Sequence, residues 1–313
     1  MTKPARVAII GAGGVGGYYG GLLARAGHQV GFLARGANLN VLRERGVVVR
    51  TADEEWTAVV DAADDARELS EPFVEGDLAL VTTKAYSLTE ISPAVRAFAE
   101  RGATILPLLN GVEAAETLVK LGVPREQIVG GVTYISAVRI APGTIERRTA
   151  AQRVIVGELP RGTSTRVKAV AAMFENAGAR GEASDDITVA LWQKFVFLSS
   201  IAAGCGLARL PLGAVRKNPL GARLLERAVR EAVAVGRARG VALRKDEEEQ
   251  TLAAIQSLPE GTEPSLLLDI RSGSRTEVDV LSGAIARFAT EVGLDTPIHD
   301  TAALALAQPS IGG

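Results

Sequence analysis

The chain has 313 residues, and its 35 lysines and arginines nearly balance 36 aspartates and glutamates, giving a formal net charge of −1. This balance excludes the strongly basic surface by which proteins attract nucleic acids or anionic membranes, so we expect neither as a partner. A composition of 47% hydrophobic and 23% charged residues indicates a globular fold, and the length favours two domains.

Three further observations concern location. The single cysteine cannot form an internal disulfide, which is typical of a reducing compartment. The N-terminal residues show no signal-peptide pattern. The longest uncharged stretch in the middle of the chain, 195–208, is too short to span a bilayer. We therefore expect a cytoplasmic protein with no membrane span.

The first half of the chain alternates short apolar runs with helical segments. Residues 6–10 (RVAII) predict a buried strand, and a glycine cluster then leads into a predicted helix over 18–26 that ends at Gly27. Similar runs predict further strands over 29–34, 77–82 and 104–109. Strands that alternate with helices in this way are typical of a parallel sheet with crossover helices.

Two segments between these strands have patterns of their own. Ser92 followed by Pro93 predicts the start of a helix, with the serine as N-cap and the proline in the first turn. The segment 53–77 carries ten carboxylates and one arginine. We expect it to form a solvated connection and helix face rather than an ion site, because runs of like charge usually face water.

The second half changes from strands to helices. The pattern is strand-rich over 128–159, and nearly everything after residue 164 predicts helix, including long helices over 185–201 and 216–239. We therefore predict an α/β domain over 1–180 with a mostly parallel sheet, followed by an all-α domain over 181–313. A cleft shared by two such domains is the expected place for a small ligand.

A glycine-rich loop directly follows the first predicted strand. It matches the pattern GxGxxG and consists of Gly11, Ala12, Gly13, Gly14, Val15 and Gly16. In a dinucleotide-binding turn the first glycine permits the tight turn, the second lets the backbone approach a pyrophosphate, and the third lets helix and strand pack closely. The pattern alone is weak in a chain with 34 glycines. Its position between a strand and a helix N-terminus indicates a dinucleotide site.

The end of the second predicted strand indicates which dinucleotide is preferred. Sites for NAD usually place Asp or Glu there to bind the ribose hydroxyls, whereas this chain has Arg35 and no acidic residue before Glu44. An arginine can pair with a 2′-phosphate and stack on adenine. We therefore predict NADP(H) as the cofactor, with a solvated strand-end charge as the alternative interpretation of Arg35.

Reduction of a carbonyl also needs a proton donor. The two histidines, His28 and His299, lie at a helix–strand turn and near the last helix, with no evident catalytic partner, and no His/Cys cluster indicates a metal. A lysine or a carboxylic acid remains by elimination. Lys84 and Asn110 end two predicted strands, and Lys194 interrupts an otherwise apolar helix, where poor solvation lowers a lysine pKa. A lysine that extends to solvent from a core helix is the equally simple alternative for Lys194.

Together these residues resemble the ketopantoate reductase (2-dehydropantoate 2-reductase) family, almost from end to end. The most specific block is 264–270 (PSLLLDI) leading to 275–279 (RTEVD). The resemblance also includes the glycine loop, Arg35, Thr83-Lys84, Leu109-Asn110-Gly111 and Trp192-Gln193-Lys194. The resemblance implies a Rossmann-type domain followed by a helical domain like the C-terminal domain of 6-phosphogluconate dehydrogenase. It also implies that the helical domain binds substrate and packs as a homodimer.

The resemblance further implies roles for single residues. Lys194 is then the proton donor and Glu277 the active-site carboxylate. Substrate contacts fall to Asn110, Ser265 and Lys84, and cofactor contacts beyond the loop and Arg35 fall to Lys84, Asn110, Ala137 and Glu277. The implied reaction is the NADPH-dependent reduction of ketopantoate, a 2-oxo acid, to pantoate in pantothenate and coenzyme A biosynthesis.

The chain departs from the family at one place. Well-known members carry Asn four and eight residues after the catalytic lysine, where this chain has Leu198 and Ala202. Hydrocarbon therefore replaces amides that could bind a polar substrate, and neighbouring Ser199 or Ser200 could compensate. The alternatives are a related reductase for a more apolar 2-oxo acid and a non-catalytic NADP(H)-binding redox sensor. The presence of both Lys194 and Glu277 argues against the sensor.

Overall fold

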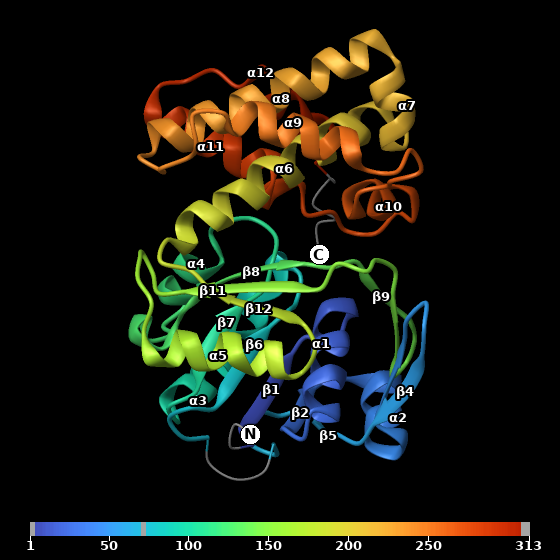
Figure 1. The fold of residues 1–313 in the computed structure, drawn as a ribbon, viewed down its shortest axis with the longest axis vertical. Helices are drawn as coiled ribbons and strands as arrows, with labels where there is room; N and C mark the ends of the chain where they lie inside the picture. The colour runs from blue at the N-terminus through green and yellow to red at the C-terminus, as the bar shows by residue number, and fades with distance from the viewer. Residues whose placement is uncertain (1–3, 70–72, 308–313) are drawn as a thin grey trace. The chain divides into compact units, whose positions relative to one another are not determined.

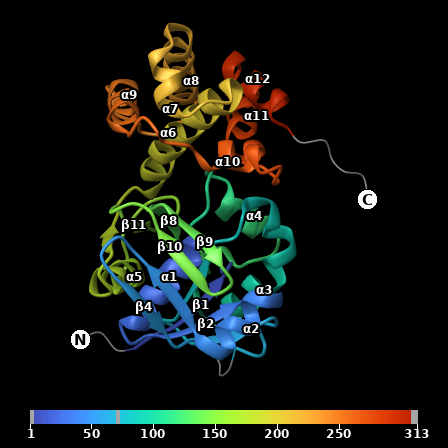
Figure 2. The same ribbon diagram turned by 90° about the vertical axis from the view of Figure 1, so that its right-hand side faces the viewer.

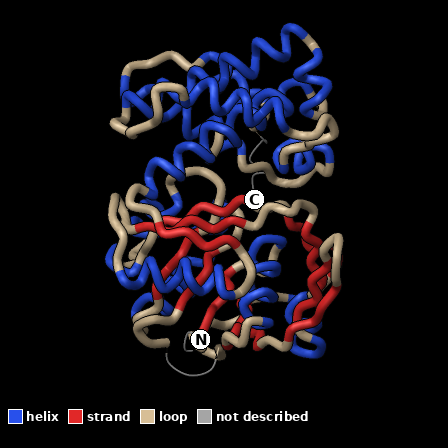
Figure 3. Tube along the Cα trace, viewed as in Figure 1, coloured by secondary structure: helices blue, strands red, loops and turns tan. Residues whose placement is uncertain are grey.

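The computed structural model describes residues 4–69 and 73–307. Contacts within it divide the chain into two compact units, Met1–Leu109 with Glu113–Thr188, and Asn110–Val112 with Val189–Gly313. Figures 1 and 3 show that the strands belong to the first unit and that the second is helical. This arrangement confirms the predicted fold class, an α/β domain with a parallel sheet and a helical C-terminal domain.

The unit division differs from the domain boundary expected after residue 180. That boundary falls inside strand β12 (Arg180–Ala183), which pairs in parallel with β11 (Arg153–Gly157) and so belongs to the first unit. The chain leaves the first unit after Thr188, just inside a long helix. The short segment Asn110–Val112 belongs to the second unit, although the residues on both sides of it belong to the first.

The first unit is built on a five-stranded sheet in which every pairing is parallel. In sheet order the strands are β5 (Asp61–Ala63), β2 (Gln29–Leu33), β1 (Arg6–Ile10), β6 (Leu78–Val81) and β7 (Thr104–Pro107). The central strand β1 is fully buried from Val7 to Ile10, as its apolar run predicts. The helices that connect or follow these strands are α1 (Gly14–Arg25), α2 (Gly36–Arg45), α3 (Leu88–Glu100) and α4 (Ala114–Lys120), with the 3-10 turns η1 (Ala85–Ser87) and η2 (Arg125–Gln127).

Two smaller sheets complete the first unit. One has the order β4 (Glu55–Ala58), β3 (Val47–Arg50), β10 (Thr144–Arg147), β9 (Ala137–Ala141), and the other consists of β12, β11 and β8 (Gly130–Tyr134), against which α5 (Thr165–Asn176) packs. The strand-rich pattern over 128–159 is thereby confirmed. The expectation of a solvated helix face over 53–77 is wrong for its described part, because β4 pairs with β3 and β5 extends the parallel sheet beside β2. Residues 70–72 lie outside the described residues.

The predicted helix start at Ser92 is also wrong. Helix α3 begins at Leu88, directly after η1, and Pro93 lies inside it. A proline there leaves the carbonyl four residues earlier without its helical N–H donor. The Ser92 hydroxyl donates to that carbonyl, of Thr89, at 3.0 Å. The serine therefore compensates for the proline within the helix and does not cap it.

The described part of the second unit is helical. Its elements are α6 (Ile187–Ala208), α7 (Leu212–Lys217), α8 (Pro219–Ala238), α9 (Glu247–Ser257), α10 (Ser265–Arg271), η3 (Val278–Val280), α11 (Ser282–Val292) and α12 (Pro297–Ala305) (Figure 2). Its core gathers aromatic rings from α6 and α11, with Trp192, Phe195 and Phe288 in mutual contact. Several helices thus bury one apolar core, as their amphipathic patterns require.

Helix α6 is longer than the uncharged stretch in the sequence suggests. It has 22 residues because it begins at Ile187, and by length and composition it could cross a membrane. Buried core helices of globular proteins meet the same criterion, and 56% of its most apolar window is buried. Within the described residues it is the one helix with this property.

Candidate active site

The glycine loop has the geometry that a dinucleotide requires. Gly11 adopts φ +113°, and a Cβ on it would lie 2.7 Å from the Thr83 backbone nitrogen, so only glycine fits this turn between β1 and α1. A Cβ on Gly16 would overlap the Gly11 carbonyl oxygen. In contrast, a Cβ on Gly13 would meet nothing within 4 Å. The first and third glycines therefore serve close packing, and the second faces open space in which a pyrophosphate could approach the backbone.

Other predicted cofactor residues lie around this loop. A Cβ on Gly14 would overlap the carbonyl of Ala137, so the start of β9 packs directly on the first turn of α1. Lys84 follows β6 and precedes η1. The nearby Thr82 hydroxyl donates to the Gly11 carbonyl at 2.8 Å, which fixes the end of β6 beside the loop. The carboxyl ends of β1 and β6 thus meet at one edge of the sheet, the usual ligand edge of a parallel sheet.

Arg35 follows β2 and stands immediately before α2. Its guanidinium forms an ion pair with Glu90 of α3, and the two side chains are 70% and 58% exposed. Such an exposed pair contributes little stability. Arg35 is therefore held at the sheet edge by a partner that an incoming phosphate could readily replace.

The second unit brings together three of the predicted site residues. Asn110 donates from Nδ2 to Oε2 of the buried Glu277 at 3.2 Å. The next residue, Gly111, has φ +85°, and a Cβ on it would lie 2.8 Å from the Val280 carbonyl oxygen. The segment after β7 is therefore fastened to η3, and this packing explains why Asn110 belongs to the helical unit. Lys194 of α6 interacts electrostatically with Glu277.

The electrostatics of Lys194 suit a general acid. Burial lowers its pKa from 10.5 to about 8, and the Glu277 carboxylate partly opposes this effect by favouring the charged form. A proton donor works best when its pKa is close to the working pH. Lys194 is half-buried, and the lowered pKa indicates that its ammonium group is poorly solvated. Within the second unit, one electrostatic interaction and one hydrogen bond thus link the lysine, the carboxylate and the amide.

The remaining predicted substrate residues have different surroundings. Ser265 is the first residue of α10 and is exposed. Leu198 is partly buried and Ala202 is buried. Ser199 donates to the Phe195 carbonyl at 2.7 Å and Ser200 to that of Val196 at 2.8 Å, and both serines are fully buried. The idea that one of these serines replaces the missing amides is therefore wrong.

Both histidines have structural environments. Nδ1 of His28 accepts from the Ala5 backbone N–H at 3.2 Å. His299, for which the sequence shows no evident partner, is fully buried, with Nε2 at 3.0 Å from the Ala228 carbonyl and Nδ1 at 3.2 Å from the Ser282 hydroxyl. Burial lowers its pKa to about 4. Across the described ranges, no cluster of three or more His, Cys, Asp or Glu side chains could hold a metal.

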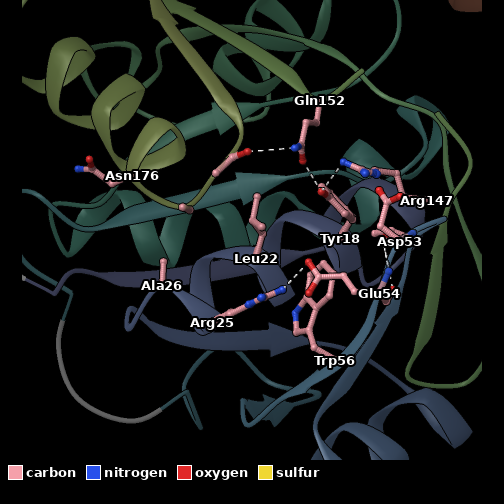
Figure 4. Close-up of a pocket in the computed structure, with 13 residues that line it drawn as sticks. Tyr18, Leu22, Arg25, Ala26, Asp53, Glu54, Trp56, Arg147, Gln152 and Asn176 are labelled. Atoms are coloured by element: carbon pink, nitrogen blue, oxygen red, sulfur yellow. Dashed lines mark hydrogen bonds and ion pairs between the residues drawn. The ribbon is translucent and has the colours of Figure 1, made fainter. Parts of the chain in front are cut away.

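A cavity of about 410 Å³ lies elsewhere in the first unit, lined by α1, the β3–β4 turn, β10 and the end of α5 (Figure 4). Arg25 pairs with Glu54 at 2.8 Å and lies over the Trp56 ring, 4.7 Å from its centroid. The Tyr18 hydroxyl bonds to Gln152. The buried indole N–H of Trp56 has no partner among the described residues. None of the predicted site residues lines this cavity.

The chain matches two models of one family. The model described as ketopantoate reductase PanE/ApbA matches residues 7–161, and its C-terminal counterpart matches residues 186–309. The chain is 31% identical to the 2-dehydropantoate 2-reductase of Halobacterium salinarum, covering 95% of this chain and 96% of that protein. It is 28% identical to the uncharacterized oxidoreductase YkpB of Bacillus subtilis, covering 94% and 95%.

Solved structures show the same similarity over the whole chain. The 2-dehydropantoate 2-reductase of Geobacter metallireducens aligns with a TM-score of 0.87 at 29% identity, covering 96% of this chain and 98% of that one. A ternary structure of D-mandelate dehydrogenase with NADH and anilino(oxo)acetate aligns with a TM-score of 0.85 at 22% identity, covering 96% and 97%. At that lower identity, the second likeness concerns the fold.

Proposed function

The chain belongs to the ketopantoate reductase family, whose members are nicotinamide-dependent oxidoreductases acting on a CH–OH group, and on this basis we propose that it reduces ketopantoate to pantoate with NADPH. The reaction would serve pantothenate and coenzyme A biosynthesis. We also propose that the protein is cytoplasmic and forms a homodimer, as expected in the sequence analysis. Sedimentation of the purified protein tests the homodimer.

The observation that carries the proposal is the half-buried Lys194 of α6, which interacts with Glu277, whose carboxylate in turn accepts a hydrogen bond from Asn110; desolvation there lowers the lysine pKa to about 8. When bound, the nicotinamide supplies a hydride to the keto carbon. Lys194 donates its proton to the keto oxygen, so that the carbonyl becomes an alcohol and the lysine becomes neutral. Glu277 stabilises the protonated lysine before transfer, and Asn110 holds that carboxylate in place. The lysine regains its proton from solvent before the next turnover.

The first unit offers one feature that suits both dinucleotides and one that favours NADPH as the reductant. The glycine loop provides an open backbone position at Gly13, which suits the pyrophosphate of either dinucleotide. Arg35 stands at the end of β2, where a 2′-phosphate would lie, and its present partner Glu90 is exposed and replaceable. The NADH in D-mandelate dehydrogenase shows that this fold also accepts the dinucleotide without that phosphate.

A second candidate substrate is a more apolar 2-oxo acid. Leu198 and Ala202 follow Lys194 by one and two helical turns and so lie on the same side of α6. The Ser199 and Ser200 hydroxyls are bonded to the helix backbone and offer no replacement for amide groups. The compound bound in D-mandelate dehydrogenase, anilino(oxo)acetate, is an oxo acid with an aromatic substituent.

Oxidation of NADPH and NADH against a panel of 2-oxo acids tests these proposals. The panel contains ketopantoate, its analogue without the hydroxyl, and an aryl 2-oxo acid. A higher kcat/KM for ketopantoate supports the first proposal, and a preference for the other acids supports the second. Absence of turnover with every acid, despite NADPH binding, would contradict both and favour a sensor. The variant Leu198→Asn should shift the preference toward the hydroxylated acid, since it restores an amide on that face.

A further inference from the structure

We propose that Arg139, on β9, is a further cofactor-binding residue that binds the pyrophosphate of the dinucleotide. This inference rests on the proposed NADPH-dependent function. It adds to the first unit a second cation whose target differs from that of Arg35. Three features support it: β9 packs on α1, Arg139 contacts the glycine loop, and no carboxylate in the described part of the chain pairs with it.

The β9–β10 hairpin covers the beginning of α1. The carbonyl of Ala137 occupies the position that a Cβ on Gly14 would need, and the Ile145 side chain does the same at Gly17. Arg139 pairs directly with Ile145 across the hairpin, and side chains of directly opposite residues lie on the same face. Arg139 therefore lies on the face of the hairpin whose Ile145 side chain packs on α1.

The guanidinium of Arg139 reaches the loop itself. Its Nη1 lies 3.4 Å from the carbonyl oxygen of Ala12, the residue before the open position at Gly13. Nδ2 of Asn38 donates to the same carbonyl, also at 3.4 Å. Oδ1 of Asn38 accepts from the Gly143 backbone N–H at 2.7 Å. Asn38 thus ties the loop to the β9–β10 turn and already supplies a donor to Ala12. The remaining N–H groups of Arg139 are not needed to hold the loop.

Arg139 differs from most nearby arginines in its ion pairing. No carboxylate of the described residues lies within 4.0 Å of its guanidinium, and the side chain is exposed. By contrast, Arg35 pairs with Glu90, and Arg148 on the same hairpin pairs with Glu146 at 3.0 Å. An exposed guanidinium without a carboxylate, beside a glycine loop and a helix N-terminus, is suited to a phosphate, which it can bind through two parallel N–H bonds.

The location of the contact selects the pyrophosphate over the 2′-phosphate. Arg139 touches the loop residue next to Gly13, where the backbone is open to a pyrophosphate. Arg35 stands instead at the end of β2, the position that reads the ribose. The two arginines therefore have separable effects: Arg139 acts on NADPH and NADH alike, and Arg35 acts on NADPH alone.

Equilibrium titration of the full chain with NADPH and with NADH tests the proposal without relying on catalysis. We expect Arg139→Gln to raise both Kd values about tenfold or more, because a charge-assisted bond to phosphate is lost, and to leave their ratio unchanged. Arg139→Lys keeps the charge but not the paired donors and should give a smaller loss. The control Arg148→Gln removes an exposed arginine of the same hairpin and should change neither Kd by more than about twofold.

Four outcomes would decide against the inference or its premise. Unchanged Kd values in Arg139→Gln would overturn the proposal, and so would a loss confined to NADPH, which would assign Arg139 to the 2′-phosphate. An equal rise of both Kd values in Arg148→Gln would show that the change reflects overall surface charge, and it would also overturn the proposal. If the wild-type chain binds neither dinucleotide, the proposed function itself fails, which is distinguishable from these results.

Discussion

The proton-donor role of Lys194 predicts a descending limb in the pH profile of reduction. The lysine must be protonated to donate, and burial lowers its pKa from 10.5 to about 8. This difference corresponds to about 3 kcal/mol less stabilisation of the charged form than in water. We therefore expect kcat/KM to be level below about pH 7 and to fall about tenfold per pH unit above the pKa, reaching about one hundredth of the plateau near pH 10.

The assay is the initial rate of NADPH oxidation at low 2-oxo acid concentration over this pH range. The variant Glu277→Gln removes the charge that raises the Lys194 pKa, so the limb should move to lower pH. In Lys194→Arg the side chain stays protonated throughout, and the limb should disappear together with most of the activity. A wild-type limb near pH 10, or a limb that Glu277→Gln leaves in place, would refute the reasoning.

Three other predictions concern stability and cofactor choice. In the unfolded chain His299 binds a proton below about pH 6.5, whereas in the folded protein it does so only below about pH 4. Acidification between these values should therefore lower the free energy of unfolding, measured with urea, by about 3 kcal/mol. A His299→Gln variant that loses the same stability on acidification would contradict this. Trp56→Phe removes a buried N–H without a hydrogen-bond partner, so the free energy of unfolding should stay unchanged or rise by about 1 kcal/mol. A decrease of more than about 1 kcal/mol would contradict this prediction. Arg35→Ala should weaken NADPH binding about tenfold and change NADH binding little. Glu90→Gln removes the ion-pair partner of Arg35 and should strengthen NADPH binding up to about fivefold. Equal effects on both dinucleotides would argue against a 2′-phosphate at Arg35.

Much of the fold follows from local sequence patterns. The apolar run 6–10 and the glycine loop after it predict a buried strand and a tight turn because both depend on neighbouring residues. Lys194 is likewise visible as a charge in an apolar helix, where desolvation lowers its pKa. Strand β4 is different: it lies in an acidic segment that predicts a solvated connection, and pairing with β3 decides its conformation.

The contacts that sequence reasoning missed depend on distant packing. Arg139 carries no local signal, since only the hairpin that places β9 on α1 brings it to Ala12. The contact between Asn110 and Glu277 joins residues far apart in the chain, and neither strand periodicity nor helix periodicity predicts it. The buried bonds of Ser199 and Ser200 depend on which face of α6 is covered. That face cannot be assigned in a helix that is apolar on all sides.

The most direct test of the central claim compares turnover with cofactor binding in Lys194→Ala. We predict that NADPH-dependent reduction of ketopantoate, or of the preferred 2-oxo acid, falls by at least about a hundredfold, because a general acid contributes on that scale. The Kd for NADPH should stay within about threefold of the wild-type value, since the glycine loop and Arg35 lie in the other unit. Near-normal turnover in this variant would contradict the account.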